Sequence, residues 1–331
     1  MLLKLLRRKM IKKINPRILI IVLALVAAFV GGTIYGKQLA LKERVAGATA
    51  EKAESAVNFE PTKSKKPNFK FFVMAFCPFG NQAEMGIKPV AELLSDKVEW
   101  EPHYIVNKQN ENQVKEMCQT RIYDKKKCQQ YVGQGYFPDL ETCKQQFYSS
   151  KEECFKKETN NCLATKDNNY YCSLHGKQEL NQDVREICAW NLTSDKKKWW
   201  QFVDLVNKNC QPTNADSCWQ NQAGKAGLDE SKIQECFNKQ GIELLDKEVA
   251  VSQKFSVTGS PSVFVNDTPY PPEGAYDQEG KAKMTINKEL FSQNEYRSPE
   301  AFKQSVCAGF NKQPKECRTE LPKESGATGG C

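Results

Sequence analysis

Residues 72–84 read FVMAFCPFGNQAE, and the order of features in them indicates how the chain folds. An apolar, strand-like run ends at Cys77, a Cys-Pro-Phe-Gly turn follows, and helical spacing begins at Gln82. The first amides of a helix lack partners and the helix dipole is positive there, so a thiolate at Cys77 should be stabilised and reactive. Pro78 suits the first helical position, where its missing N–H is not needed. The alternative is that Cys77 is simply one member of a disulfide set.

Gly80 stands where a Cys-x-x-Cys redox motif would have its second cysteine. Reduction of the usual kind has two steps, in which one thiolate attacks and a neighbouring thiol resolves the mixed disulfide. None of the fourteen cysteines lies three residues from another, so the chain has no such motif. The sequence therefore predicts mixed-disulfide formation at Cys77 without a nearby resolving thiol.

Apolar patterns on both sides of Cys77 predict an α/β domain. A proline inside the first helix, Pro89, should kink it. The segment "VTGSPSVFVND" places Pro261 in a turn just before a short strand. We expect strands at 69–76, 98–106 and 262–266, and helices at 82–94, 242–255 and 301–310.

A long polar section, residues 107–239, carries ten of the cysteines. Its composition predicts short helices that bury little apolar surface and need disulfides to hold them. With only two histidines in the chain, the closely spaced Cys and His pairs of a structural zinc site are missing. We therefore expect a disulfide framework in an oxidising compartment, with no metal and no cofactor. Leaving out Cys77 and Cys331, twelve cysteines should form six bridges, one of them Cys307–Cys317.

The N-terminal part predicts a membrane anchor. Residues 1–17 hold seven basic and no acidic residues, and an almost entirely apolar segment at 18–36 follows. The positive flank places residues 1–17 in the cytoplasm and the rest outside. The alternative is a cleaved signal peptide, with small-residue sites between Ala46 and Ala50. Residues 37–67 read as a stalk.

The net charge of +8 is not a nucleic-acid signature. Beyond residue 17 the chain has 41 basic and 40 acidic residues, so the excess lies in the N-terminal segment. We find no basic stripe with interleaved aromatic residues in the rest of the sequence. The partners expected are a membrane and protein or small-thiol disulfides, without nucleic acid.

The Cys77 region and the Pro261 region together resemble the thioredoxin-fold superfamily, and in particular the DsbA-like oxidoreductases. The resemblance covers roughly residues 68–312. It implies a thioredoxin-like fold with a helical insertion, in which Cys77 is the catalytic nucleophile and Pro261 is a cis-proline that pairs with the substrate backbone. Substrate contacts are implied for Pro78 and Phe79 beside Cys77, and for Ser260 before the proline.

A narrower resemblance lies at "CSLHGKQELNQDVREIC", residues 172–188. It is similar to the signature of gamma-interferon-inducible lysosomal thiol reductases, with His175, Gly176, Glu179 and Cys188 in register. One extra residue follows the first cysteine, Leu180 replaces a cysteine and Asp183 replaces an asparagine. The other interpretation of His175 is an ordinary loop residue.

The function predicted is that of a membrane-anchored, extracytoplasmic thiol–disulfide exchange protein, periplasmic or cell-surface, acting through Cys77 alone. It would have a thioredoxin-like domain at 68–320 and a flexible tail at 321–331. That tail ends in Cys331, a possible resolving thiol if it reaches Cys77. An intermolecular bridge or an external small thiol are alternatives for Cys331. The alternatives for the protein are a non-catalytic peptide-binding module, with Cys77 bridged or inert, and a surface structural protein.

Overall fold

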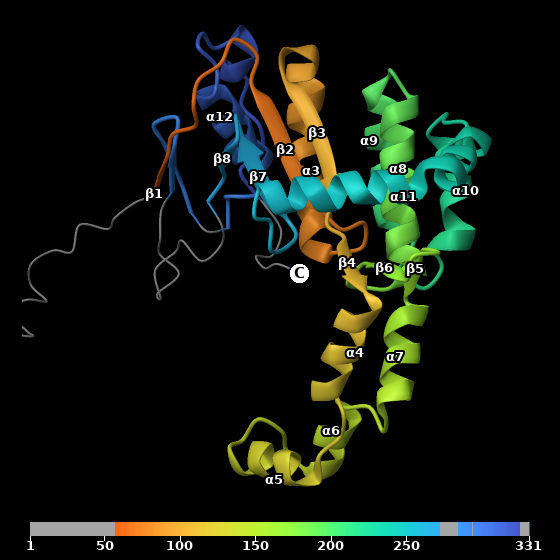
Figure 1. Cartoon of the computed structure of the whole chain (residues 1–331). Helices are drawn as coiled ribbons and strands as arrows, with labels where there is room; N and C mark the ends of the chain where they lie inside the picture. The colour runs from red at the N-terminus through yellow and green to blue at the C-terminus, as the bar shows by residue number, and fades with distance from the viewer. Residues whose placement is uncertain (1–56, 272–283, 293, 325–330) are drawn as a thin grey trace, which may run out of the picture. The chain divides into compact units, whose positions relative to one another are not determined.

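A computed structural model describes four parts of the chain, namely residues 57–271, 284–292, 294–324 and 331 (Figure 1). No helix within these parts is both long enough and apolar enough to cross a membrane. The predicted cytoplasmic segment 1–17 and the predicted anchor 18–36 lie outside the described residues, as does most of the predicted stalk.

A four-stranded mixed sheet forms the centre of the domain. Its order is β3-β2-β7-β8, with β2 and β3 parallel and the other pairs antiparallel. The strands are β2 (Asn68–Val73), β3 (Glu99–Tyr104), β7 (Ser262–Val265) and β8 (Thr268–Pro269). Five of the six β2 residues are buried, which explains its nearly continuous apolar sequence. This arrangement, with a helix directly after β2, is a mixed α/β thioredoxin-like fold, as predicted.

Alternating β2 side chains bury the two faces of the sheet against different helices. On one face Phe69 packs edge-on against Phe302 of α12 (Pro299–Ala308), which itself packs on α3 (Pro78–Leu94). On the other face Phe72 packs against Phe255, the residue that follows α11 (Glu230–Lys254). Figure 1 shows α11 crossing the sheet on the side away from α3.

The cysteine-rich section consists of short helices and three short strands. Polar N-cap side chains such as Asn110, Asp124, Asp139 and Ser150 accept hydrogen bonds from the first helical amides, which defines where these weakly apolar helices begin. The helices are α4 (Glu111–Thr120), α5 (Lys125–Gly133), α6 (Leu140–Gln145), α7 (Lys151–Asn160), α8 (Lys177–Leu192), α9 (Lys196–Asn209) and α10 (Ala215–Lys225). The strands are β4 (Asn107–Asn110), β5 (Cys162–Ala164) and β6 (Asn169–Cys172), in one antiparallel sheet.

Disulfides hold this section together, as predicted. The six bridges expected among twelve cysteines are all present, and they are Cys118–Cys154, Cys128–Cys143, Cys162–Cys172, Cys188–Cys236, Cys210–Cys218 and Cys307–Cys317. The first three staple an arm in which α4 packs on α7 and α5 on α6 (Figure 1). The apolar cluster inside the arm has only three fully buried members, Val114, Cys118 and Cys154, so the disulfides supply much of its cohesion.

Several predicted boundaries were wrong. The fold begins before residue 68, because β1 (Val57–Phe59) pairs with β9 (Met284–Ile286), which pairs with β10 (Glu289–Phe291). The predicted stalk therefore does not extend to 67. Helix α3 has Pro78 in its first position, as predicted, and so begins before the helical spacing that starts at Gln82; it continues through Pro89. Helix α11 runs across the predicted end of the insertion at 239. Two short 3₁₀ helices, Ser95–Lys97 and Lys315–Arg318, follow α3 and α12.

Candidate thiol–disulfide site

Cys77 is the N-cap residue of α3. Its backbone is extended, and its Sγ accepts a hydrogen bond from the Gly80 amide at 3.4 Å. Pro78 occupies the first turn, which contains no acidic residue. The sulfur therefore lies where the exposed amides and the positive end of the helix dipole stabilise negative charge. Cys77 itself is fully buried.

The loop before β7 faces this cysteine. The Ser260–Pro261 peptide bond is cis, and the Ser260 carbonyl oxygen lies 3.6 Å from the Cys77 Sγ. The Ser260 hydroxyl accepts a hydrogen bond from the Met74 amide at 3.2 Å, which fixes the loop to the end of β2. The structure thus brings together Cys77, Ser260 and Pro261, three of the site residues predicted from sequence.

The third component of the site is Cys331, which forms a disulfide with Cys77. Its backbone also pairs with Ser260. The Cys331 amide donates to the Ser260 carbonyl at 2.9 Å, and the Ser260 amide donates to the Cys331 carbonyl at 3.1 Å. This exchange of two hydrogen bonds is the pattern of a residue pair in an antiparallel sheet. The prediction that left Cys77 outside the disulfide set was wrong, and the approach of Cys331 to Cys77, one of the alternatives considered for the tail, is found.

Two glycines make room for this arrangement. A Cβ added to Gly259 would lie 2.8 Å from the Cys331 carbonyl oxygen, so only glycine lets the backbone of Cys331 approach this closely. A Cβ added to Gly80 would lie 2.7 Å from the Ser260 hydroxyl oxygen. Gly80 is therefore not an open place for a second cysteine, because the Ser260 side chain already fills that space.

Buried carboxylates of α8 hold the chain just before Cys77. The Phe76 amide donates to Glu179 at 2.9 Å, and the Ala75 amide donates to Asp183 at 2.9 Å. Glu179 also accepts from the Ser173 hydroxyl and from the amide and ring of His175. The sequence resemblance had His175 and Glu179 in register and Asp183 as a departure, and it gave the acids no role. Their hydrogen bonds hold the backbone just before Cys77.

Burial raises the pKa values of the carboxyl groups below the site. It raises the pKa of Asp183 well above its usual value, and the nearby charge of Glu179 raises it further. Burial also raises the pKa of Glu186 to about 7, although hydrogen bonds from Tyr104 and Gln182 oppose the change. Glu84 of α3 has a pKa raised by its burial and by the charge of Glu186. Burial therefore favours the uncharged form of each of these three carboxyl groups.

The two remaining predicted contact residues lie at the start of α3. Pro78 is exposed and Phe79 is half-buried. The guanidinium of Arg297, a buried residue, lies 5.7 Å from the centre of the Phe79 ring. The side chains of Pro78 and Phe79 therefore lie at the edge of the site, and no described contact joins either of them to the two sulfurs.

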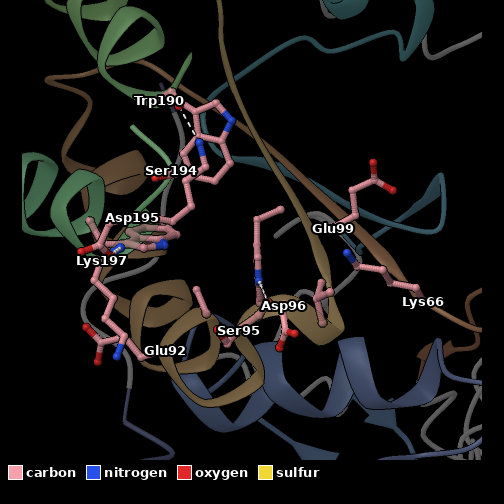
Figure 2. Close-up of a pocket in the computed structure, with 14 residues that line it drawn as sticks. Lys66, Glu92, Ser95, Asp96, Glu99, Trp190, Ser194, Asp195 and Lys197 are labelled. Atoms are coloured by element: carbon pink, nitrogen blue, oxygen red, sulfur yellow. Dashed lines mark hydrogen bonds between the residues drawn. The ribbon is translucent and has the colours of Figure 1, made fainter. Parts of the chain in front are cut away.

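A separate pocket of about 390 Å³ lies where the end of α3, the start of β3 and the loop from α8 to α9 meet (Figure 2). Its wall includes Trp100, Trp190 and Trp200 among lysine and carboxylate side chains. It shares no residue with the Cys77 site, so it takes no part in the chemistry considered for Cys77. Within the described parts of the chain, no group of three or more His, Cys, Asp or Glu residues is arranged to hold a metal ion.

Comparisons with known proteins found similarity to one family and to several solved structures. The family described as the vacuolar sorting receptor thioredoxin-like domain matches residues 121–279, which is less than half of the chain and excludes Cys77. The reduced disulfide bond oxidoreductase DsbG of Mycobacterium tuberculosis is 13% identical, with a TM-score of 0.38 over 79% of this chain and 88% of that one. Oxidised DsbA of the same organism is 13% identical, with a TM-score of 0.39 over 78% and 95%. No curated protein matches the sequence significantly.

Proposed function

We propose that this protein carries out thiol–disulfide exchange and that Cys77 and Cys331 are its redox pair. The predicted mechanism with one cysteine is replaced by one with two, the second supplied by the tail. Cys77 provides the sulfur that the start of α3 stabilises as a thiolate. The Ser260–Pro261 loop provides the backbone groups that hold a cysteine-bearing segment in place. The substrates proposed are protein or small-molecule thiols and disulfides.

One observation carries the proposal. Cys331 is bonded to Cys77 through sulfur while its backbone exchanges two hydrogen bonds with Ser260. The site therefore accommodates an extended segment and its cysteine together, which is what exchange with a protein substrate requires. Backbone pairing is independent of side chains, so another cysteine-bearing segment can use the same two groups of Ser260.

We propose further that the domain is anchored by residues 18–36 on the extracytoplasmic side of a membrane. Support comes from the basic segment 1–17 and the apolar run after it. The seven disulfides of the described residues also fit an oxidising compartment. Protease added outside intact cells should digest the domain and spare residues 1–17. Release of a soluble form beginning near residue 51 would contradict the anchor.

The test of exchange is a redox titration of the whole protein in glutathione buffers, with alkylation and mass analysis of each cysteine. Cys77 and Cys331 should become reduced together, before the six other disulfides. The oxidised protein should then oxidise a reduced model peptide that contains two cysteines, and Cys77→Ser should not. Equal resistance of all seven disulfides to reduction would refute the proposal.

The second candidate is a binding module without turnover. The observation that favours it is the complete burial of Cys77 within a disulfide. In that case the bridge fixes the tail in place and has only a structural role. The same titration separates the two, because a structural bridge should stay oxidised under conditions that reduce a redox pair.

A further inference from the structure

The two residues of the Cys77–Cys331 bridge differ in exposure. Cys77 is fully buried, whereas Cys331 is partly exposed. We infer that external thiols enter and leave through Cys331, so that the tail carries the mixed disulfide and Cys77 is the internal leaving group. This inference rests on the proposed function, and it reverses the role expected of Cys77 as the residue that meets the substrate.

Crowding around Cys77 supports this assignment. The Gly80 amide and the Ser260 carbonyl lie 3.4 and 3.6 Å from the Sγ of this fully buried residue. An attacking thiolate has to reach one of the two sulfurs directly, and Cys331 is the partly exposed residue of the pair.

Leaving-group stability points the same way. When Cys331 is attacked, the Cys77 sulfur departs as a thiolate into the position where the Gly80 amide and the positive end of α3 stabilise it. When Cys77 is attacked, the sulfur of Cys331 departs instead, and no described contact offers its sulfur a hydrogen-bond donor. A more stable thiolate leaves faster, so the first route is also favoured kinetically.

A dithiol substrate alone supplies the electrons and protons that the half-reaction needs. One substrate thiolate attacks the Cys331 Sγ, the bond to Cys77 Sγ breaks, and Cys77 keeps the electron pair as a thiolate. The second substrate thiol, deprotonated, then attacks the substrate sulfur of the mixed disulfide and releases Cys331 as a thiolate. The substrate loses two electrons and two protons and gains a disulfide, while the protein gains the two electrons and becomes a dithiol.

Gly259 is the residue that allows the tail to dock in this manner. A side chain there would meet the Cys331 carbonyl oxygen at 2.8 Å and so interfere with its hydrogen bond from the Ser260 amide. Gly259→Ala should displace the tail and make the Cys77–Cys331 bridge easier to reduce. Gly224→Ala is the matched control, since Gly224 is an exposed helical glycine with open space around its Cα.

The experiment uses the oxidised full chain and a monothiol probe, reduced glutathione. After brief exposure the reaction is stopped with acid, remaining thiols are alkylated, and peptides are mapped by mass spectrometry. Glutathione should be found on Cys331 and the alkyl group on Cys77, with an excess of about tenfold over the reverse arrangement. Gly259→Ala should raise the rate of adduct formation, and Gly224→Ala should not.

Cys331→Ser distinguishes failure of this inference from failure of the proposed function. In that variant Cys77 carries a thiol and should react with glutathione disulfide. Glutathione found mainly on Cys77 of the wild-type protein would overturn the assignment of Cys331 while leaving exchange intact. Absence of any adduct on the wild type, with a reactive Cys77 in Cys331→Ser, would also overturn it. Absence of reaction in both proteins would refute the proposed function as well.

Discussion

Replacing His103 by glutamine should remove a large, pH-dependent contribution to the stability of the domain. His103 lies on β3 with 15% of its side chain exposed, and its Nδ1 is 3.2 Å from Glu248 of α11. On the other side of the ring, Nε2 is 3.7 Å from Glu101. Burial acts to lower the pKa of His103, but the close approach of Glu101, the hydrogen bond with Glu248 and the charges of both carboxylates outweigh it and raise the pKa to about 9.

The size and sign of the effect follow from this pKa. A histidine whose pKa is 6.5 in the unfolded chain and about 9 in the fold contributes about 3 kcal/mol to the free energy of unfolding. Because the pKa is raised on folding, the contribution is complete below pH 6.5 and is lost as the pH rises to 9 and above. The same carboxylate of Glu248 accepts the Tyr104 amide, so the contact ties α11, the helix leading to the Ser260 loop, to β3.

The assay is urea unfolding of wild type and His103→Gln at pH 6 and pH 9.5, followed by tryptophan fluorescence with the disulfides intact. The free energy of unfolding of the wild type should exceed that of the variant, and this difference should be about 3 kcal/mol larger at pH 6 than at pH 9.5. Other groups that titrate nearby, such as Glu186 with its pKa of about 7, are common to both proteins and cancel in the comparison. An equal difference at the two pH values would refute the reasoning.

Three further outcomes are expected. Gly80→Cys should not create a fast dithiol site and should lower stability by about 1–3 kcal/mol, because its Cβ would crowd the Ser260 hydroxyl; a gain in an insulin-reduction assay would contradict this. Glu179→Gln should lower the free energy of unfolding by about 2 kcal/mol and so lower the urea midpoint, since an amide cannot accept all the hydrogen bonds that the carboxylate accepts. An unchanged midpoint would show that these bonds are dispensable. Replacing Cys118 and Cys154 by serine should speed hydrogen exchange in α4 and α7 alone, and faster exchange in β2 would show that the arm is not a separate unit.

Local sequence patterns were enough to predict the central elements. The strand before Cys77, the helix after it and the strand after Pro261 are where apolar runs and turn residues indicated. These features depend on neighbours in the chain, so a single sequence contains the information. The helix start at Pro78 was placed too late by the spacing argument, although the proline itself is typical of a first turn.

The contacts that complete the site are long-range, and no local pattern specifies them. Nothing near Glu179 indicates that it accepts the Phe76 amide, and nothing near Ser260 indicates that its hydroxyl excludes a side chain at residue 80. A cysteine on a polar tail has many possible partners, so the bridge from Cys331 was one of several hypotheses. The three-residue strands β1 and β9 are too short for any periodicity to predict.

The span of the Cys77–Cys331 bridge has a consequence for how the protein matures. Six of the seven disulfides join cysteines between 8 and 48 residues apart, whereas these two are 254 apart. As the chain is synthesised, each local pair can oxidise once its own segment has been made. Cys77 precedes the other thirteen cysteines of the sequence, and its partner Cys331 is made 254 residues later. The Cys77–Cys331 bridge can therefore form only after all six local pairs have been synthesised, and until then the Cys77 thiol has no native partner.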